Sequence, residues 1–223
     1  MHKVLDFIKK NKQFSFFLLL VILLALITIF APVIAPQDPY ASDLKNALQP
    51  PSSAHWFGTD KLGRDIFSRV IYASRSSLPA TLILVVLIFA IGTLLGTLAG
   101  YFGGWIDAVI MRISDMMISF PGMVLAIAVA GIMGASVKNA VIAVAVVSWP
   151  KYARLARSLV MKIRHEDYIY AAIVTGSKTS YILRKYMLPN VIPTLVITAA
   201  TDIGGMMLEL AGLSFLGFGA KAP

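Results

Sequence analysis

Charge-free stretches of the chain predict membrane-spanning helices. The first stretch lies between Lys12 and Asp38, and residues 14–30 at its centre are apolar apart from two hydroxyl side chains. A helix of about 20 apolar residues crosses the roughly 30 Å hydrocarbon layer of a membrane. The pattern therefore predicts a first transmembrane helix over 14–35. A cleaved signal peptide is disfavoured, because its apolar region would be only about 7–15 residues long.

Four later windows continue this pattern and give five predicted spans in all. The fourth span is short and crosses only if Lys138 and Lys151 extend outward to the interface. The fifth span is interrupted by Asp202 and Glu209. The later spans are predicted at 78–102, 116–137, 139–150 and about 191–218.

Composition supports a bilayer as the main solvent of this all-α protein. The chain of 223 residues is 58% hydrophobic and 14% charged, with a mean hydropathy of +0.79, whereas soluble domains are about 45–50% apolar and about 25% charged. The absence of cysteine excludes disulfides and Cys-ligated metal centres. The net charge of +9 arises from basic residues between apolar runs, a placement typical of membrane orientation rather than of nucleic-acid binding.

The distribution of basic residues predicts the orientation. The first thirteen residues hold four Lys against one Asp, and the segment 151–188 holds eight basic residues against two acidic ones. The segment 36–75 is nearly balanced, with five basic and four acidic residues. Cytoplasmic loops carry the excess of Lys and Arg. We therefore expect a multi-pass membrane protein whose N-terminus and 151–188 face the cytoplasm.

These assignments predict four parts of the chain. They are a cytoplasmic N-terminus (1–13), a first transmembrane helix (14–35), an extracytoplasmic segment with an amphipathic helix (36–77) and a transmembrane domain (78–223) that contains a cytoplasmic loop (151–189).

Two local patterns concern packing rather than activity. Gly92, Gly96 and Gly100 recur every four residues, which lines one helix face with small residues and predicts close approach of a neighbouring helix. Arg112 and Asp115 are three residues apart, so a local ion pair is expected at the membrane surface.

The segment 151–188 predicts a short amphipathic helix. Ile169, Ala172 and Ile173 form an apolar stripe, and Gly176 is a typical residue for ending the helix. Such a helix is a docking element for a cytoplasmic partner; the alternative is a solvated loop that only sets orientation. The string from Gly176 to Thr179 is not a phosphate-binding loop, because no glycine directly precedes Lys178.

Two carboxylates in the fifth span are candidate site residues. Asp202 and Glu209 are seven residues apart and share a helix face, with Met206 between them. Ionisable groups at membrane depth are costly and usually face a bundle interior or a water-filled cavity. The alternative is that Asp202 hydrogen-bonds to a neighbouring helix and Glu209 lies near the outer interface. The three histidines are dispersed, so a metal centre is not expected.

Several blocks of sequence together carry a family resemblance. They are 56–69, 100–107, 111–115, 120–121, 148–154, 171–190 and 213–219. Through these blocks nearly the whole chain resembles the inner-membrane permease subunits of binding-protein-dependent ABC importers of the dipeptide, oligopeptide and nickel group. The segment 202–212 is more similar to the nickel or metal–chelate permeases.

The resemblance implies a type I ABC importer transmembrane fold. Members of the family have six spans, so the sixth is expected to be missing here and the domain 78–223 to be C-terminally incomplete. The family resemblance also implies that a helix in the loop inserts into a groove of the ATP-binding subunit, with the coupling residues Asp167, Ala171, Ala172 and Gly176. Tyr170 stands where the family usually has Glu.

The resemblance further implies the function and the partners. The chain is expected to be a non-enzymatic permease subunit that moves peptides, nickel or a metal–chelate by alternating access. Its expected partners are a second homologous permease, two ATP-binding subunits that hold ATP and Mg, an extracytoplasmic solute-binding protein and the lipid bilayer; no cofactor in this chain and no nucleic acid are expected. An ion-coupled secondary transporter that uses Asp202 and Glu209 is the alternative, and a membrane scaffold is a third possibility.

Overall fold

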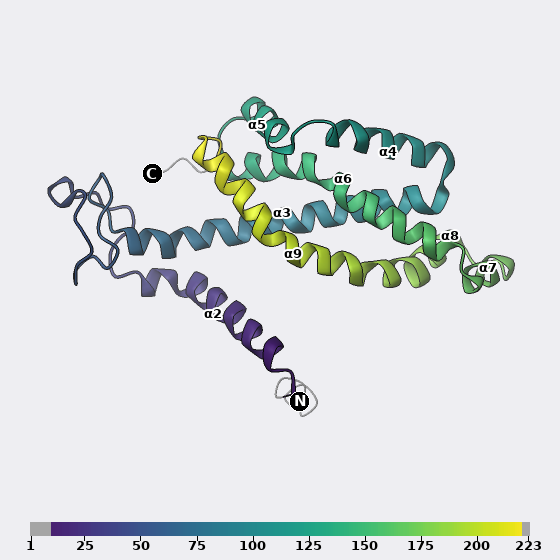
Figure 1. Ribbon diagram of the computed structural model, residues 1–223, viewed down its shortest axis with the longest axis horizontal. Helices are drawn as coiled ribbons and strands as arrows, with labels where there is room; N and C mark the ends of the chain where they lie inside the picture. The colour runs from purple at the N-terminus through teal and green to yellow at the C-terminus, as the bar shows by residue number, and fades with distance from the viewer. Residues whose placement is uncertain (1–9, 220–223) are drawn as a thin grey trace. The chain divides into compact units, whose positions relative to one another are not determined.

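The computed structural model describes residues 10–219. Lys3, Asp6 and Lys9 of the predicted cytoplasmic N-terminus lie outside these residues. The described chain is helical, and its only strand-like pairing is an isolated bridge between Thr59 and Asp65. The elements (Figure 1) are α2 (Lys12–Ile34), a 3₁₀ turn (Leu44–Asn46), α3 (Ile66–Phe102), α4 (Gly104–Ile118), α5 (Gly122–Met133), α6 (Val137–Arg164), α7 (Asp167–Val174), α8 (Thr179–Ile182), a π-helical turn (Leu183–Met187) and α9 (Leu188–Phe215).

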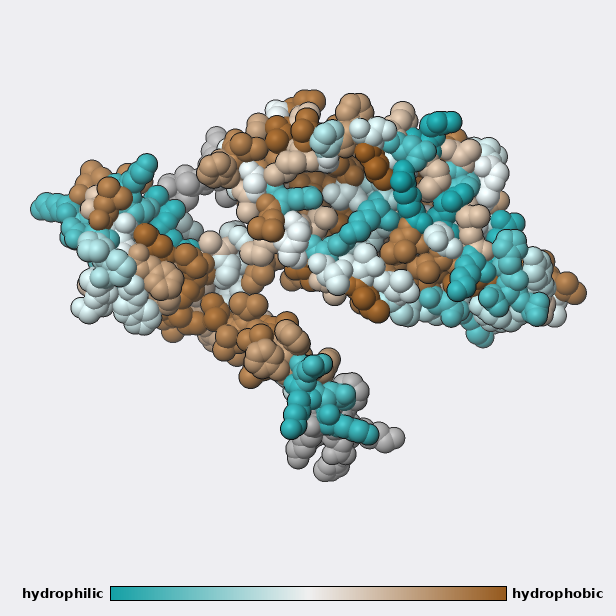
Figure 2. Space-filling model, viewed as in Figure 1, coloured by the Kyte–Doolittle hydropathy of each residue, from teal (hydrophilic) through white to brown (hydrophobic). Residues whose placement is uncertain are grey.

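The chain forms two compact units, divided between Leu78 and Pro79 within α3. In the first unit, α2 agrees with the span predicted at 14–35. Its apolar side chains cover the whole helix surface and are exposed, with Ala31 as the one buried residue, and Figure 2 shows them as a brown surface. A helix that is apolar on all sides is suited to a hydrocarbon environment.

Residues 35–65 of the first unit form hydrogen-bonded turns that lead into α3. The buried Asp65 carboxylate accepts bonds from the backbone N–H and the hydroxyl of Ser68 at 2.8 and 2.6 Å, and His55 Nδ1 lies 3.0 Å from it. This is an N-cap, which satisfies a free N–H of the first turn. Burial raises the pKa of Asp65, but the bonds from Ser68 and His55 lower it by more, so this pKa lies below its ordinary value.

The amphipathic helix predicted within 36–77 is not a separate element. From Ile66 it continues directly into the second predicted span, as one helix of 37 residues. Pro79 lies inside that helix without ending it.

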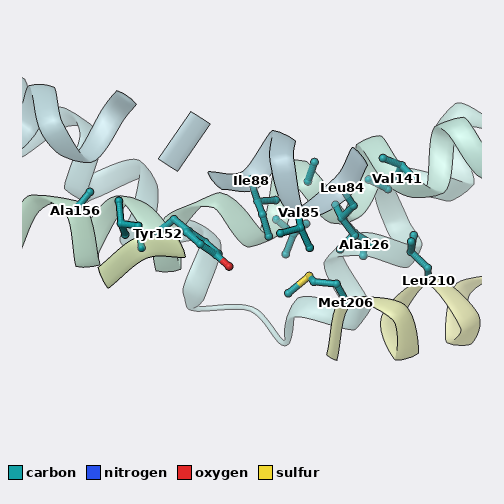
Figure 3. Packing of buried hydrophobic residues seen from close by; sticks show 14 of the residues in the cluster. Leu84, Val85, Ile88, Ala126, Val141, Tyr152, Ala156, Met206 and Leu210 are labelled. Atoms are coloured by element: carbon teal, nitrogen blue, oxygen red, sulfur yellow. The ribbon is translucent and has the colours of Figure 1, made fainter. Parts of the chain in front are cut away.

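The second unit is built around α6. Figure 1 shows α6 between α4 and α9, and it also packs against α5 and residues 79–102 of α3. Tyr152, Val144 and Val160 of α6 are fully buried together with Leu84 and Ile88 of α3, and Figure 3 shows part of this core.

The glycine repeat packs as predicted. A Cβ on Gly92 would overlap the Cβ of Tyr152, and one on Gly96 would overlap the carbonyl oxygen of Ala153. A Cβ on Gly100 would lie 2.8 Å from the carbonyl oxygen of Arg157. Small residues are therefore required where α3 crosses α6.

The helices at two predicted spans have other bounds than predicted. The third, at 116–137, is a bent pair in which α4 and α5 meet at 93°, and α5 has only 12 residues. Pro121 explains this break, because proline lacks a backbone N–H and disfavours helical geometry at the residue before it. The fourth, at 139–150, is part of a 28-residue helix that runs through Pro150 to Arg164.

By length and composition, three or four stretches of the described residues qualify as membrane spans, so the five predicted spans are not confirmed. α2, α3 and the continuous helical stretch Thr179–Phe215 are long and apolar enough to cross a membrane, and the bent α4–α5 pair adds a fourth if it counts as one span. α6 is not among them; its C-terminal half carries five Lys and Arg residues.

Candidate functional site

The predicted coupling helix is present as α7. Asp167 lies in its first turn, where the helix dipole stabilises a negatively charged side chain. After the helix, the N–H of Gly176 donates to the carbonyl of Ile173 at 2.9 Å, and the N–H of Ser177 donates to that of Ala172 at 3.0 Å. Gly176 has a φ of +77°, a conformation that side-chain-bearing residues adopt only with strain.

α7 has an anchored side and a free side. Ile169 and Ala172 are buried in the second unit, whereas Asp167, Ala171 and Ile173 are exposed. The apolar stripe predicted for this helix is therefore corrected, because Ile173 does not share the burial of the other two. Of the four predicted coupling residues, Asp167, Ala171 and Gly176 lie at the surface and Ala172 contributes to anchoring.

A basic surface follows α7 along the chain. Lys178, Arg184 and Lys185 line an open hollow of about 830 Å³ together with Tyr181. Lys185 Nζ lies 5.1 Å from the centre of the Tyr181 ring, which is a cation–π distance. These side chains give this hollow a positive charge.

Ion pairs join α6 to both neighbouring helices. Arg157 pairs with Asp107 of α4 through two of its nitrogens, and Arg154 pairs with Asp115 of α4. The predicted local pair between Arg112 and Asp115 is therefore wrong. Asp115 lies near the C-terminal end of α4, where the long side chain of Arg154 from α6 reaches it.

Asp202 of α9 is held by α6. Its two carboxylate oxygens each accept a bond of 2.7 Å from Lys151 Nζ, and one of them also accepts a bond of 3.0 Å from the Tyr152 hydroxyl. This agrees with the alternative in which Asp202 bonds to a neighbouring helix. Met206, one turn further along α9, is buried in the core (Figure 3).

Glu209 lies in a different environment. It lines a partly open cavity of about 230 Å³ together with residues from the α4–α5 break and from α6. Asp202 and Met206 are not part of this lining, so the structure separates the three residues that the sequence grouped. The lining residues are Met117, Ile118, Phe120, Gly122, Ala126, Val144, Val147, Ser148 and Glu209.

Comparison with known proteins gives the family. The family described as "Binding-protein-dependent transport system inner membrane component" matches residues 92–222, and the "N-terminal TM domain of oligopeptide transport permease C" matches residues 2–51. A dipeptide transport system permease protein of Alkalihalophilus pseudofirmus is 44% identical over 97% of this chain and 71% of its own length. The chain belongs to this family of inner-membrane permeases.

Other relatives of the permease carry different transport names. The nickel transport system permease protein of Escherichia coli is 40% identical over 92% of the chain and 74% of its own length. A glutathione transport system permease protein of Pectobacterium atrosepticum is 43% identical over 92% of the chain and 68% of its own length. The resemblance noted from the sequence is thus confirmed for the family as a whole.

A solved structure confirms the fold. The MetNI methionine ABC transporter, in inward-facing conformations, aligns with a TM-score of 0.57 and 22% identity, over 65% of the permease and 73% of that chain. The permease therefore has the type I ABC importer transmembrane fold.

Sequence reasoning missed the α6 partners of the acidic residues. Lys151, Arg154 and Arg157 recur every three residues, which places them along one side of a helix. That spacing was the available signal, but it became readable only once α6 was known to continue through Pro150.

Proposed function

We propose that the permease is the membrane subunit of an ATP-driven, binding-protein-dependent importer of the bacterial cytoplasmic membrane. Its relatives are named for dipeptide, nickel and glutathione transport. The solute is a peptide or a nickel or metal–chelate species. A second permease completes the pathway, two ATP-binding subunits hold ATP and Mg, and a solute-binding protein delivers the solute on the outer side.

The observation that carries this proposal is the free side of α7. Exposed Asp167, Ala171 and Ile173 form a surface for an ATP-binding subunit, while Ile169 and Ala172 fix the helix to its own unit. α7 follows α6 and is joined through α8 and the π-helical turn to α9. A displacement of α7 therefore reaches both long helices that carry Lys151, Asp202 and Glu209.

Alternating access follows from this connection. ATP binding brings the two ATP-binding subunits together, and α7 transmits that movement to α6 and α9. In this scheme the N-terminus and the segment 151–189 face the cytoplasm, as the charge distribution predicts. We place the solute pathway beside α9, with Glu209 in contact with it, Asp202 positioned by Lys151 and Tyr152, and Met206 supporting the helix from within the core.

An ion-coupled secondary transporter is the second candidate. Glu209 supports this candidate because its carboxyl group lines a partly open cavity that an ion can enter. Carboxylates within membrane-spanning helices are common ion sites. Uptake that a protonophore abolishes, and that continues after ATP is depleted, would support this candidate over the importer.

Replacing Gly176 by leucine tests the coupling role. Strain at the end of α7 should displace its docking surface, so that ATP-driven uptake falls roughly tenfold, as expected for about 1–2 kcal/mol of backbone strain. ATP hydrolysis and the amount of permease in the membrane should be retained. The measurement is uptake and ATP hydrolysis in proteoliposomes that contain the complete transporter.

Gly217→Leu is the matched control. Gly217 also has a positive φ, +89°, open space around an added Cβ and the same pair of backbone hydrogen bonds as Gly176, but it follows α9 rather than α7. Its replacement should cost similar local strain and leave the ratio of uptake to ATP hydrolysis unchanged. Normal uptake in Gly176→Leu would contradict the docking role of α7.

A further inference from the structure

The cavity beside Glu209 contains a carboxyl group that has no cationic partner in the cavity lining. Its lining contains one carboxylate and no cationic side chain. Within residues 10–219 the half-buried Glu209 side chain has neither a hydrogen bond nor an ion pair. A carboxylate that is partly removed from water is unfavourable without a partner, so a positive group from outside the chain would stabilise the ionised form of this site.

Asp202, the other carboxylate of α9, is fully paired within the chain. Asp202 already accepts bonds from Lys151 and Tyr152. Its charge is balanced within the chain, and it has no need of an external cation. Glu209 is therefore the carboxylate of α9 that is open to a ligand.

The cavity also lies at a break in the helical backbone. Met117, Ile118, Phe120 and Gly122 flank the 93° bend between α4 and α5. Irregular backbone at membrane depth is tolerated where it lines a cavity, and broken helices mark solute sites in transporters. The end of α4 and the start of α5 carry partial charges of opposite sign, which largely cancel. The electrostatic potential of the cavity is therefore set mainly by the Glu209 side chain.

The remaining lining residues favour an ammonium group over a bare metal ion. The Ser148 hydroxyl is a second hydrogen-bond acceptor, and the Phe120 ring offers a cation–π surface. Divalent metals need several oxygen, imidazole or thiolate ligands. The described residues contain no group of three or more His, Cys, Asp or Glu side chains that could hold one.

We propose that this cavity binds a primary ammonium group of the transported solute, such as the amino terminus of a peptide. Glu209 is the counterion, Ser148 is the second acceptor, and Phe120 covers the cation. The inference rests on the proposed import function and adds to it a class of solute.

The absence of cysteine from the chain gives a direct test. A cysteine introduced as Ser148→Cys is reacted, in membranes containing the complete transporter, with methanethiosulfonate reagents that carry either an ethylammonium or an ethylsulfonate group. Rates are normalised to those of a free thiol in solution, and the cysteine-free permease gives the background from the partner subunits. The ammonium reagent should react about tenfold faster, as expected for one nearby charge.

The role of Glu209 is isolated by variants in the Ser148→Cys background. Glu209→Gln should bring the ratio of the two rates close to that of the free thiol, whereas Glu209→Asp should keep the preference and shows that the fold tolerates a change at this position. Thr194→Cys, exposed on α9 outside the cavity lining, is the positional control. The ratio of the two labelling rates at Thr194→Cys should be the same whether Glu209 is present or replaced by Gln.

Protection by solutes then tests the chemical class. Dialanine at about twice its Kd should slow labelling of Ser148→Cys roughly threefold by occupancy, and N-acetyl-dialanine at the same concentration should not. Protection by nickel chloride but not by dialanine would overturn the assignment. Equal normalised rates of the two reagents would also overturn the assignment, because a partner subunit would then neutralise Glu209. A preference for the ammonium reagent that persists in Glu209→Gln would overturn it as well, because Glu209 would not be its source.

The labelling rates are measured without ATP. Failure of the Gly176→Leu test would remove the coupling role of α7 and leave the charge preference of the cavity intact. Failure of the labelling test would leave the import function standing without an ammonium site. The two proposals are therefore distinguishable.

Discussion

The helices α2 and α6 are of similar length, and they are stabilised in different ways. α2 is apolar on all sides and buries only Ala31. α6 buries twelve residues, carries five cations in its C-terminal half and is joined to α4 and α9 by ion pairs. The environment around α2 supplies its stabilisation, whereas the chain itself supplies that of α6. Apolar composition therefore locates a span but does not show which interactions stabilise it.

The largest expected effect comes from filling the contact between α3 and α6. Gly96→Leu places a side chain against the carbonyl oxygen of Ala153, so the two helices must separate. We expect a loss of about 3 kcal/mol and a fall in Tm of roughly 6–12 °C, measured by thermal unfolding in detergent. Gly205→Leu, with nothing within 4 Å of the added Cβ, should leave Tm nearly unchanged; equal losses would refute the packing account.

Removing one ion pair of α6 should have an intermediate effect. Asp107→Asn leaves Arg157 without its charged partner at a site where the two side chains are 19% and 31% exposed. We expect a loss of about 1–2 kcal/mol in thermal unfolding, less than for a fully buried pair. Arg112→Gln is the control, since Asp115 pairs with Arg154 instead. A larger loss in the control than in Asp107→Asn would show that the pairing is wrong.

The smallest effect is expected in α2. Leu24 is 53% exposed, so Leu24→Ala removes a side chain that lies outside the buried core. The same unfolding measurement should change by less than about 0.5 kcal/mol. A loss of about 2 kcal/mol or more, typical of a buried leucine, would mean that α2 packs like α6, and the contrast between them would disappear.

Local signals in the sequence were sufficient for elements that depend on near neighbours. The span at 14–35, the close glycine contacts of Gly92, Gly96 and Gly100, and the helix from Asp167 that ends before Gly176 all agree with the structure. In each case apolar length, residue size or a positive φ acts within a few residues. The sequence therefore predicted the position of this short helix well, and its coupling role stays a proposal.

Features that depend on distant partners were not predictable in the same way. Arg157 and Asp107 are separated by 50 residues, and Lys151 and Asp202 by 51, so helical periodicity carries no information about either pair. Pro150 was read as the end of a span, but neighbouring helices compensate for a proline inside a packed bundle. Because α6 continues, Tyr152 reaches Asp202, and only Glu209 of the two carboxylates remains open.

The π-helical turn at Leu183–Met187 has a consequence for the whole of α9. Each residue of an α-helix advances the chain by about 100° around its axis, and a π turn is wider than an α turn. The winding of these five residues thus determines which way every later side chain of the helix points. Rewinding these same five residues as an α-helix would rotate Asp202 away from Lys151 and carry Glu209 out of its cavity, without altering any residue of either site.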